Sequence, residues 1–271
     1  MRIRNLAVFS IVIVLLLSFL ATSASTSGYV TDGLVALYGG NRNQGNKHDK
    51  QSTIWKDLSG NNNDISLTLG DNVKWEDNGL FLDTIKVYLP DVIKDTINGN
   101  EFTAEVVLNN FTSKADSFNT FLNSTNDNFA LYRRVPNDVF MFKNNSNARP
   151  VTPDGTALDY LSTSVTITVT YKVGGKATLY VNGEKQGATD AVVAIGANDM
   201  YICIDHPQKK FSAVYEGLRF YNRELTAEEV AQNYEADLNP VNPATGVVPT
   251  FFYMTVALGL AGNAFKRKKE E

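Results

Sequence analysis

Two acidic residues in the stretch "EFTAE" have the spacing of a paired-carboxylate catalytic site. Glu101, Thr103 and Glu105 alternate along the chain, and on a β-strand this period of two places their side chains on one face of the sheet. Most glycosidases act through two carboxyl groups that flank the scissile bond. In the alternative interpretation the strand begins only at Phe102, and Glu101 belongs to the preceding loop. The sequence favours this alternative.

Other reactive residue types do not form a recognisable site. His48 and His206 are the only histidines, and neither has another metal-ligating side chain at a typical spacing. Cys203 lies in the apolar stretch "MYICID", where we expect a packed thiol and not a nucleophile. The sequence has no Gly-x-Ser-x-Gly motif and no phosphate-binding glycine loop. It therefore favours a binding protein over an enzyme.

Aromatic and cationic side chains gather in "NFALYRRVPNDVFMFKNN". A sugar site combines apolar surface with a few placed polar donors, and this stretch is the richest in both. Tyr132, Arg133 and Arg134 are therefore the candidate ligand-binding residues. Alternation alone leaves two possibilities for the outward face, either that of Phe129 and Leu131 or that of Tyr132 and Arg134.

Short strands separated by turns must position these residues. In "SVTITVTYKV", five apolar or aromatic residues alternate with threonines and a lysine. This period of two predicts a strand with the five residues on its buried face and the polar residues on its other face. The five are Val165, Ile167, Val169, Tyr171 and Val173. Gly174-Gly175 and Asn182-Gly183 suit two-residue hairpin turns that need a positive φ. The chain therefore continues into a second and a third antiparallel strand.

One helix is predicted, near the end of the body of the chain. Thr226 is its expected N-cap, and Glu229 three residues later completes a capping box. Val230, Tyr234 and Leu238 then share an apolar face. About ten short strands with no βαβ alternation predict an all-β sandwich of two antiparallel sheets.

Five segments of the chain follow one another in a familiar order: "GLVALY", "WKDLSGNNND", "ATLYVNGEKQG", "MYICID" and "FSAVYEGLRFYNRELTAEEVAQNYE". This succession resembles the laminin G-like branch of the concanavalin A-like lectin/glucanase fold. The resemblance implies a jelly-roll domain over residues 29–238, with one short C-terminal helix. In the last of the five segments, we expect Tyr221 and Arg223 to hold the final strand against that helix.

The resemblance also bears on catalysis and on metal binding. Enzymes of this fold carry Glu-x-Asp-x-Glu, and this chain has Thr103 in place of the central acid, so the catalytic pattern is incomplete. Many laminin G-like domains hold one Ca²⁺ at a loop rim, through six to eight oxygen ligands. The candidate ligands here are Asp57, Asn61, Asp64 and Asp205. The alternative, an Asn/Gly turn without metal, is favoured.

The N-terminus has the layout of a secretory signal peptide. Arg2 and Arg4 precede an apolar run that ends in "ATSAS", so we expect residues 1–24 to be removed after Ala24, with cleavage after Ser25 as the alternative. An N-terminal membrane anchor is the alternative, although the run is short for a membrane span.

The C-terminal residues combine a motif, an apolar run and a basic tail. Residues 239–245 form a short linker that ends in the motif residues Asn242, Pro243, Ala244 and Thr245. Residues 246–271 start with Gly246 and contain the apolar run and the basic tail. This order resembles a Gram-positive cell-wall sorting signal of the LPxTG type. The resemblance implies that a sortase cuts between Thr and Gly and joins the Thr carboxyl to a peptidoglycan precursor. A plain transmembrane anchor is the alternative.

Composition limits the partners. The chain has 271 residues and a net charge of −4, and removal of the two basic ends makes the remainder more acidic, which argues against nucleic acid as a partner. The sequence therefore predicts a secreted, wall-anchored, monomeric and non-catalytic module that binds carbohydrate or a surface glycoprotein. A glycoside hydrolase and a structural or pilus-associated subunit are the alternatives. For localisation, an extracellular domain held in the membrane is the alternative.

Overall fold

The computed structural model describes residues 28–114, 116–146, 148–206 and 209–239. The expected signal peptide and the expected sorting motif lie outside these residues. Tyr29–Glu235 form one compact unit. Among the described residues, no helix is long and apolar enough to cross a membrane.

The larger sheet has eight strands, and all of its pairings are antiparallel. Its strand order is β13 (Glu184–Asp190), β12 (Lys176–Val181), β11 (Val165–Tyr171), β7 (Phe102–Ser113), β15 (Phe211–Tyr221), β5 (Leu80–Asp83) and β4 (Val73–Trp75), with β1 (Leu34–Gly39) also paired to β15. The first half of β15 pairs with β5 and the second half with β1, so these two strands share one edge of β15.

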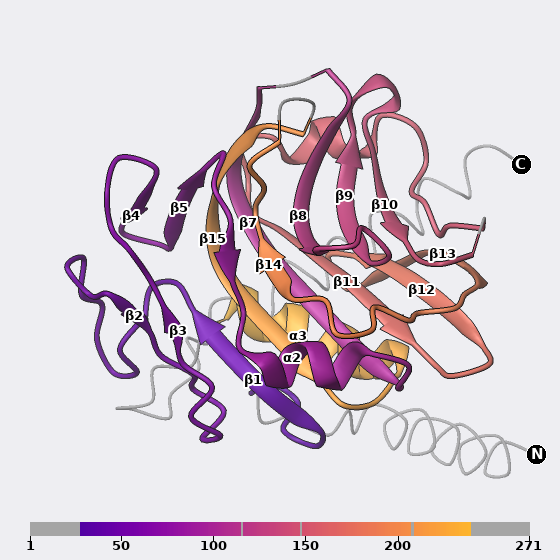
Figure 1. Ribbon diagram of the computed structural model, residues 1–271, viewed down its shortest axis with the longest axis horizontal. Coiled ribbons are helices and arrows are strands. Elements are labelled where there is room, and N and C mark those ends of the chain that lie inside the picture. The colour runs from indigo at the N-terminus through magenta and orange to yellow at the C-terminus, as the bar shows by residue number, and fades with distance from the viewer. Residues whose placement is uncertain (1–27, 115, 147, 207–208, 240–271) are drawn as a thin grey trace, which may run out of the picture. The chain divides into compact units, whose positions relative to one another are not determined.

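The second sheet has five antiparallel strands, and Figure 1 shows β8, β9 and β10 side by side within it. Its order is β10 (Val139–Lys143), β9 (Ala130–Arg134), β8 (Phe118–Ser124), β14 (Met200–Ile202) and β6 (Val87–Tyr88). A third, small sheet pairs β2 (Ile54–Trp55) with β3 (Ile65–Ser66). Short 3₁₀ turns occupy Val135–Asn137 and Thr156–Tyr160.

The core lies between the two larger sheets and is rich in phenylalanine. Phe102 of β7 lies 5.7 Å from Phe129, and Phe121 of β8 lies 5.4 Å from Phe211 of β15, measured between ring centroids. Such tilted and edge-on contacts stabilise aromatic pairs beyond their buried area. The predicted sandwich of two antiparallel sheets is therefore confirmed.

The local sequence signals account for most of the strand and turn positions. Asn182 and Gly183 both have positive φ, as the two-residue hairpin requires. A Cβ on Gly183 would meet the backbone of Ala231 at 3.3 Å, so this glycine also allows close packing of the C-terminal helix. Val173 does not belong to the buried face: β11 ends at Tyr171, and Val173 is exposed in the turn.

The C-terminal helix α3 (Ala227–Leu238) begins as predicted. Thr226 Oγ1 accepts from the Glu229 amide at 3.3 Å, and Glu229 accepts from the Thr226 amide at 2.9 Å, which completes the capping box. Val230 is buried on the helix face toward β15, in a cluster with Tyr221 and Leu225. Leu238 is exposed, so the predicted apolar face does not extend to the last residue of the helix.

A second helix, α2 (Asp91–Ile97), was not predicted. It has only seven residues, no side-chain N-cap, and a proline at the N-cap position. Two buried isoleucines, Ile93 and Ile97, anchor it to the core. A helix this short carries too little periodicity to stand out from the surrounding loops, and tertiary packing stabilises it.

Candidate functional site

A small pocket opens on the outer face of the five-stranded sheet. Leu131 of β9 points into the core and is fully buried, so its neighbour Tyr132 points to the opposite face of the sheet. The pocket has a volume of about 170 Å³. Its lining consists of Phe118, Thr120, Asp127, Ala130, Tyr132, Lys143, Arg149 and Lys209.

Two aromatic rings form the apolar part of this pocket. The centroids of Phe118 and Tyr132 lie 5.2 Å apart, with the rings nearly perpendicular. Tyr132 is only 4% exposed, whereas Phe118 is partly exposed at the start of β8. Phe118 therefore presents the aromatic surface, and Tyr132 supports it from below and contributes its hydroxyl group.

Three cations and one carboxylate form the polar part of the pocket. Asp127 accepts from Lys143 Nζ at 2.5 Å and from Lys209 Nζ at 3.1 Å. Partial burial alone would raise the pKa of Asp127, but the hydrogen bonds from the two lysines hold this pKa below its ordinary value. Asp127 is therefore ionised at neutral pH, and the pocket retains an excess of positive charge.

Arg149 supplies the third cation, and among the described residues one acceptor binds it. Its Nη1 donates to the Tyr132 hydroxyl at 3.2 Å, while Nε is buried without a hydrogen-bond partner. A guanidinium group has five N–H donors in a fixed planar arrangement. Arg149 therefore has donor capacity for a further acceptor in this region.

The two other candidate ligand-binding residues lie differently. Arg133 points inward at the end of the core, donates through Nε to Asp138 at 3.0 Å and through Nη1 to Asn119 at 3.2 Å, and is 5% exposed. Arg134 is exposed at the end of β9 and does not line the pocket. Of the three candidates, only Tyr132 belongs to the pocket.

Most of the pocket was not found from the sequence. Asp127 directly precedes the stretch that was singled out, and Lys143 lies within it. Arg149 follows that stretch by four residues, and Lys209 comes from a loop distant in the chain. Phe118 begins the strand β8, which pairs with β9 through a register shift between Thr120 and Leu122. No local sequence pattern predicts that these residues lie together in one pocket.

A laminin G-type family model of the concanavalin A-like lectin/glucanases superfamily matches residues 83–231. This range is more than half of the chain. The chain belongs to this superfamily. The match includes β7 to β15 and the beginning of α3, whereas the "GLVALY" and "WKDLSGNNND" segments precede it.

Solved structures share the fold at low sequence identity. A Trypanosoma rangeli sialidase in complex with 2,3-difluorosialic acid superposes with a TM-score of 0.58 and 15% identity over 80% of this chain and 35% of the sialidase. The binding domain of botulinum neurotoxin DC in complex with rat synaptotagmin II gives a TM-score of 0.56 and 12% identity over 76% of this chain and 52% of that one. The chain thus spans about a third to a half of these proteins, and the likeness shows the fold alone. No curated protein matches the chain at a significant level.

In this concanavalin A-like domain, Glu105 does not face a cleft. It is fully buried on the outer face of the eight-stranded sheet, in the register position opposite Arg219. Its carboxylate accepts from Arg219 Nε at 2.6 Å, from Asn233 Nδ2 of α3 at 2.7 Å and from Thr168 Oγ1 at 2.9 Å. These contacts join two strands and a helix.

The neighbouring residues of "EFTAE" also have structural surroundings. Thr103 Oγ1 donates to the Arg223 carbonyl at 2.9 Å and accepts from the Leu225 amide at 2.9 Å. Glu101 lies outside β7, in the loop that follows α2, as the favoured interpretation of the sequence predicted. The three residues therefore do not form a row of side chains along one strand.

Two residues of the last strand and the segment after it bind the helix as expected. Tyr221 accepts at its hydroxyl from Asn233 Nδ2 at 3.0 Å, and this hydroxyl donates to the Val30 carbonyl at 3.1 Å. Arg223 binds both oxygens of Glu229, at 2.8 and 2.7 Å. The expectation that Tyr221 and Arg223 hold the strand to the helix is confirmed.

The candidate calcium ligands of the domain do not fit a metal site. Asp57 Oδ1 accepts from the amides of Leu37 and Ser59, at 3.0 and 2.9 Å. Its Oδ2 accepts from Ser59 Oγ at 2.9 Å and from the Asn63 amide at 3.0 Å. With four donors bound, this carboxylate has little free capacity for a cation that needs six to eight oxygens.

Two of the other candidate ligands are similarly engaged. Asn61 donates its side-chain amide to the Leu34 and Val35 carbonyls, and Asp64 accepts from the Asp57 amide and pairs with Lys56 at 3.3 Å. Asp205 follows β14, far along the chain. Among the described residues, no group of three or more His, Cys, Asp or Glu side chains is placed to hold a metal ion.

Replacing Asp57 with alanine is expected to destabilise the domain by about 2 kcal/mol, since three part-buried amides and one hydroxyl group lose their charged acceptor. Thermal unfolding measures this loss, with the exposed Asp71→Ala as the matched control. Calcium and EDTA are expected to leave the melting temperature of the wild-type protein unchanged. A calcium-dependent rise in that temperature would show that the turn rearranges to bind the ion.

Cys203 and His48 add no reactive centre. Cys203 is buried, and this burial raises the pKa of its thiol to about 11, so the thiol is protonated at neutral pH. This confirms the expectation of a packed thiol. His48 packs edge-on against Trp75, with ring centroids 5.8 Å apart.

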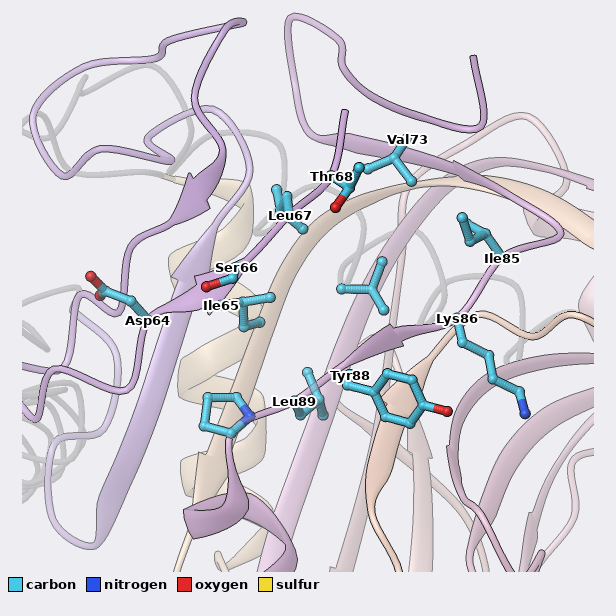
Figure 2. A pocket seen from close by; sticks show the side chains of 12 residues that line it. Asp64, Ile65, Ser66, Leu67, Thr68, Val73, Ile85, Lys86, Tyr88 and Leu89 are labelled. Carbon is cyan, nitrogen blue, oxygen red and sulfur yellow. The ribbon is translucent and has the colours of Figure 1, made fainter. Parts of the chain in front are cut away.

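A larger groove lies between β3 and β6, and Figure 2 shows Ile65 and Leu67 on one side and Tyr88 and Leu89 on the other. Its volume is about 500 Å³. Its lining is mostly apolar and lacks arginine, and its one cation, Lys86, lies 4.8 Å from the ring centroid of Tyr201. The groove is therefore less suited to a polar ligand than the pocket at Phe118 and Tyr132.

Proposed function

We propose that this protein is a non-catalytic carbohydrate-binding domain and that its binding site is the pocket formed by Phe118, Asp127, Tyr132, Lys143, Arg149 and Lys209. One observation carries the proposal: a partly exposed aromatic ring borders a pocket of about 170 Å³ that is surrounded by charged donors and an acceptor. The C–H face of a sugar ring packs on an aromatic ring, and its hydroxyl groups hydrogen-bond to the surrounding polar groups. The proposed ligands are the sugars of free glycans and of surface glycoproteins.

The surroundings of the acidic residues support binding without turnover. Glycoside hydrolysis uses two carboxyl groups about 5–10 Å apart across the scissile bond. Within the pocket lining, Asp127 is the only carboxylate, and two lysines neutralise it. Glu105 is enclosed beneath α3 and paired with Arg219.

Two of the matched structures also support a carbohydrate ligand. One is a Trypanosoma rangeli sialidase in complex with sialic acid, and the other is the binding domain of botulinum neurotoxin DC in complex with SialylT. The two proteins differ in activity, and the chain spans only part of each, so only the binding function is extended to this domain by analogy.

We further propose that the protein acts at the cell surface of a Gram-positive bacterium, exported by residues 1–24 and attached to peptidoglycan through Thr245 by a sortase. The support for this is the ordered motif, apolar segment and basic tail. The domain would then be displayed near the wall, where glycans are the prevailing ligands.

Phe118→Ala is expected to weaken glycan binding about tenfold or more, because it removes the aromatic surface of the pocket. A glycan array identifies the bound sugar, and titration calorimetry then gives the affinities of the wild type and the variant. Tyr88→Ala is the matched control, since Tyr88 is an exposed aromatic residue of the same sheet that lies outside the pocket.

Two results would count against the proposal. Loss of binding in Tyr88→Ala with full binding in Phe118→Ala would move the site to the edge of the sheet at β6. Release of reducing ends from the bound glycan by the wild-type protein would contradict the absence of turnover.

A further inference from the structure

The charge of the pocket differs in sign from the charge of the chain. The chain carries a net charge of −4, yet the pocket lining contains Lys143, Arg149 and Lys209 against the single carboxylate of Asp127. A neutral sugar offers hydroxyl groups, which do not require an excess of cations. The concentration of positive charge on an acidic protein therefore indicates an anionic ligand.

The three cations are not equally available. Lys143 and Lys209 are both engaged with Asp127, at 2.5 and 3.1 Å. Arg149 has no carboxylate partner: among its described contacts, only Nη1 is engaged, by the neutral hydroxyl of Tyr132. Its Nε is buried and unpaired. A guanidinium that lacks a charged acceptor gains when a ligand supplies one.

The chemistry of a guanidinium selects among anions. Its parallel N–H groups match the two oxygens of a planar carboxylate and form a pair of charge-assisted hydrogen bonds. The aromatic ring of Phe118 borders the same pocket and offers the apolar surface for a sugar ring. A sugar with a carboxylate group can therefore bind the guanidinium group and the aromatic ring at the same time.

We propose that the site recognises an acidic sugar and that Arg149 binds its carboxylate, while Phe118 packs against the sugar ring. This inference rests on the proposed carbohydrate-binding function and names the ligand class of that site. Lys143 and Lys209 contribute a positive potential and hold Asp127 in place.

The test compares acidic oligosaccharides with their own methyl esters. Oligosaccharides that end in glucuronic, galacturonic or sialic acid are titrated against the full protein, each beside the ester in which the carboxylate is neutral. At least one acid is expected to bind about tenfold or more tightly than its ester, since the ester cannot form the charge-assisted hydrogen bonds to the guanidinium. Its affinity is expected to fall as salt increases, whereas the affinity of the ester stays constant.

Arg149→Met tests the assigned residue, since methionine keeps the length of the side chain and removes the charge. This variant is expected to lose the preference for the acid while it binds the ester as the wild type does. Arg42→Met is the matched control, because Arg42 lies outside the pocket. Should Arg149→Met fail to fold, the comparison of acid and ester on the wild-type protein decides the question alone.

The outcomes separate this inference from the proposed function. Equal binding of acid and ester that depends on Phe118 would overturn the acidic ligand and leave carbohydrate binding in place. Preference for sulfated over carboxylated sugars would overturn the carboxylate while keeping an anionic ligand. No binding of any sugar, acidic or neutral, would overturn both proposals.

Discussion

Glu105→Gln is expected to lower the free energy of unfolding by about 3–5 kcal/mol, because it removes a fully buried charge that accepts hydrogen bonds from Arg219, Asn233 and Thr168. Glu105 is 0% and Arg219 is 1% exposed, so water cannot replace the lost partner. For a domain of this size, the melting temperature falls by roughly 6–20 °C. Thermal unfolding followed by circular dichroism measures this effect.

The size of the effect follows from the number of elements that meet at Glu105. Its carboxylate binds Arg219 of β15, Thr168 of β11 and Asn233 of α3. The guanidinium of Arg219 also lies over the ring of Tyr29, 4.6 Å from the centroid. Loss of this one charge therefore loosens the helix and the N-terminal segment from the sheet together.

Two further variants make the interpretation specific. Glu101→Gln, in the loop before β7, is expected to change the unfolding free energy by less than about 0.5 kcal/mol. Replacing both members of the pair, as in Glu105→Leu with Arg219→Met, is expected to recover most of the loss, because the two opposite charges are removed together.

A fully stable Glu105→Gln protein would contradict the structural role. If that variant also lost an activity on a polysaccharide, Glu105 would instead be a catalytic residue and the domain would be a glycosidase.

Thr245→Ala is expected to abolish covalent attachment to the cell wall, because the resemblance to a sorting signal places the sortase cut between Thr245 and Gly246. Wild-type protein is expected to be released by muramidase as a ladder of species that carry wall fragments of different sizes. The variant is expected to stay at full length in the membrane fraction. Immunoblots of the two fractions measure the distribution.

Thr250→Ala is the matched control, since it removes a threonine just after the motif and leaves the motif intact. It is expected to behave as the wild type does. If detergent extracts all of the wild-type protein at full length, the C-terminal segment is a plain membrane anchor, and the proposed attachment to peptidoglycan fails.

The sequence by itself determined the strands, the turns and the fold family. The alternation in "SVTITVTY" gives β11, the Asn182-Gly183 pair gives the next hairpin, and the capping box of Thr226 and Glu229 begins α3. Each of these signals acts over a few residues, through the period of a strand or the hydrogen bonds of a cap. Such local rules hold whatever the rest of the chain does.

Tertiary structure decided which face of a strand meets which partner. Glu105 has the spacing of a catalytic carboxylate, but its strand turns it toward Arg219 and α3. On β9, alternation predicted two faces, and only packing assigns Leu131 to the core and Tyr132 to the pocket. The physical reason is that burial depends on the layer covering each face, which is formed by residues distant in the sequence.

The pocket itself is also a product of tertiary structure. Arg149 and Lys209 come from separate loops, and they meet Tyr132 and Asp127 only because β8, β9 and β10 are neighbours in one sheet. The register shift between β8 and β9 sets which side chains of the two strands lie opposite each other. A sequence pattern records what a residue is and what its neighbours along the chain are. The electrostatic potential of a site depends instead on distances between charges, and only the folded chain fixes those distances.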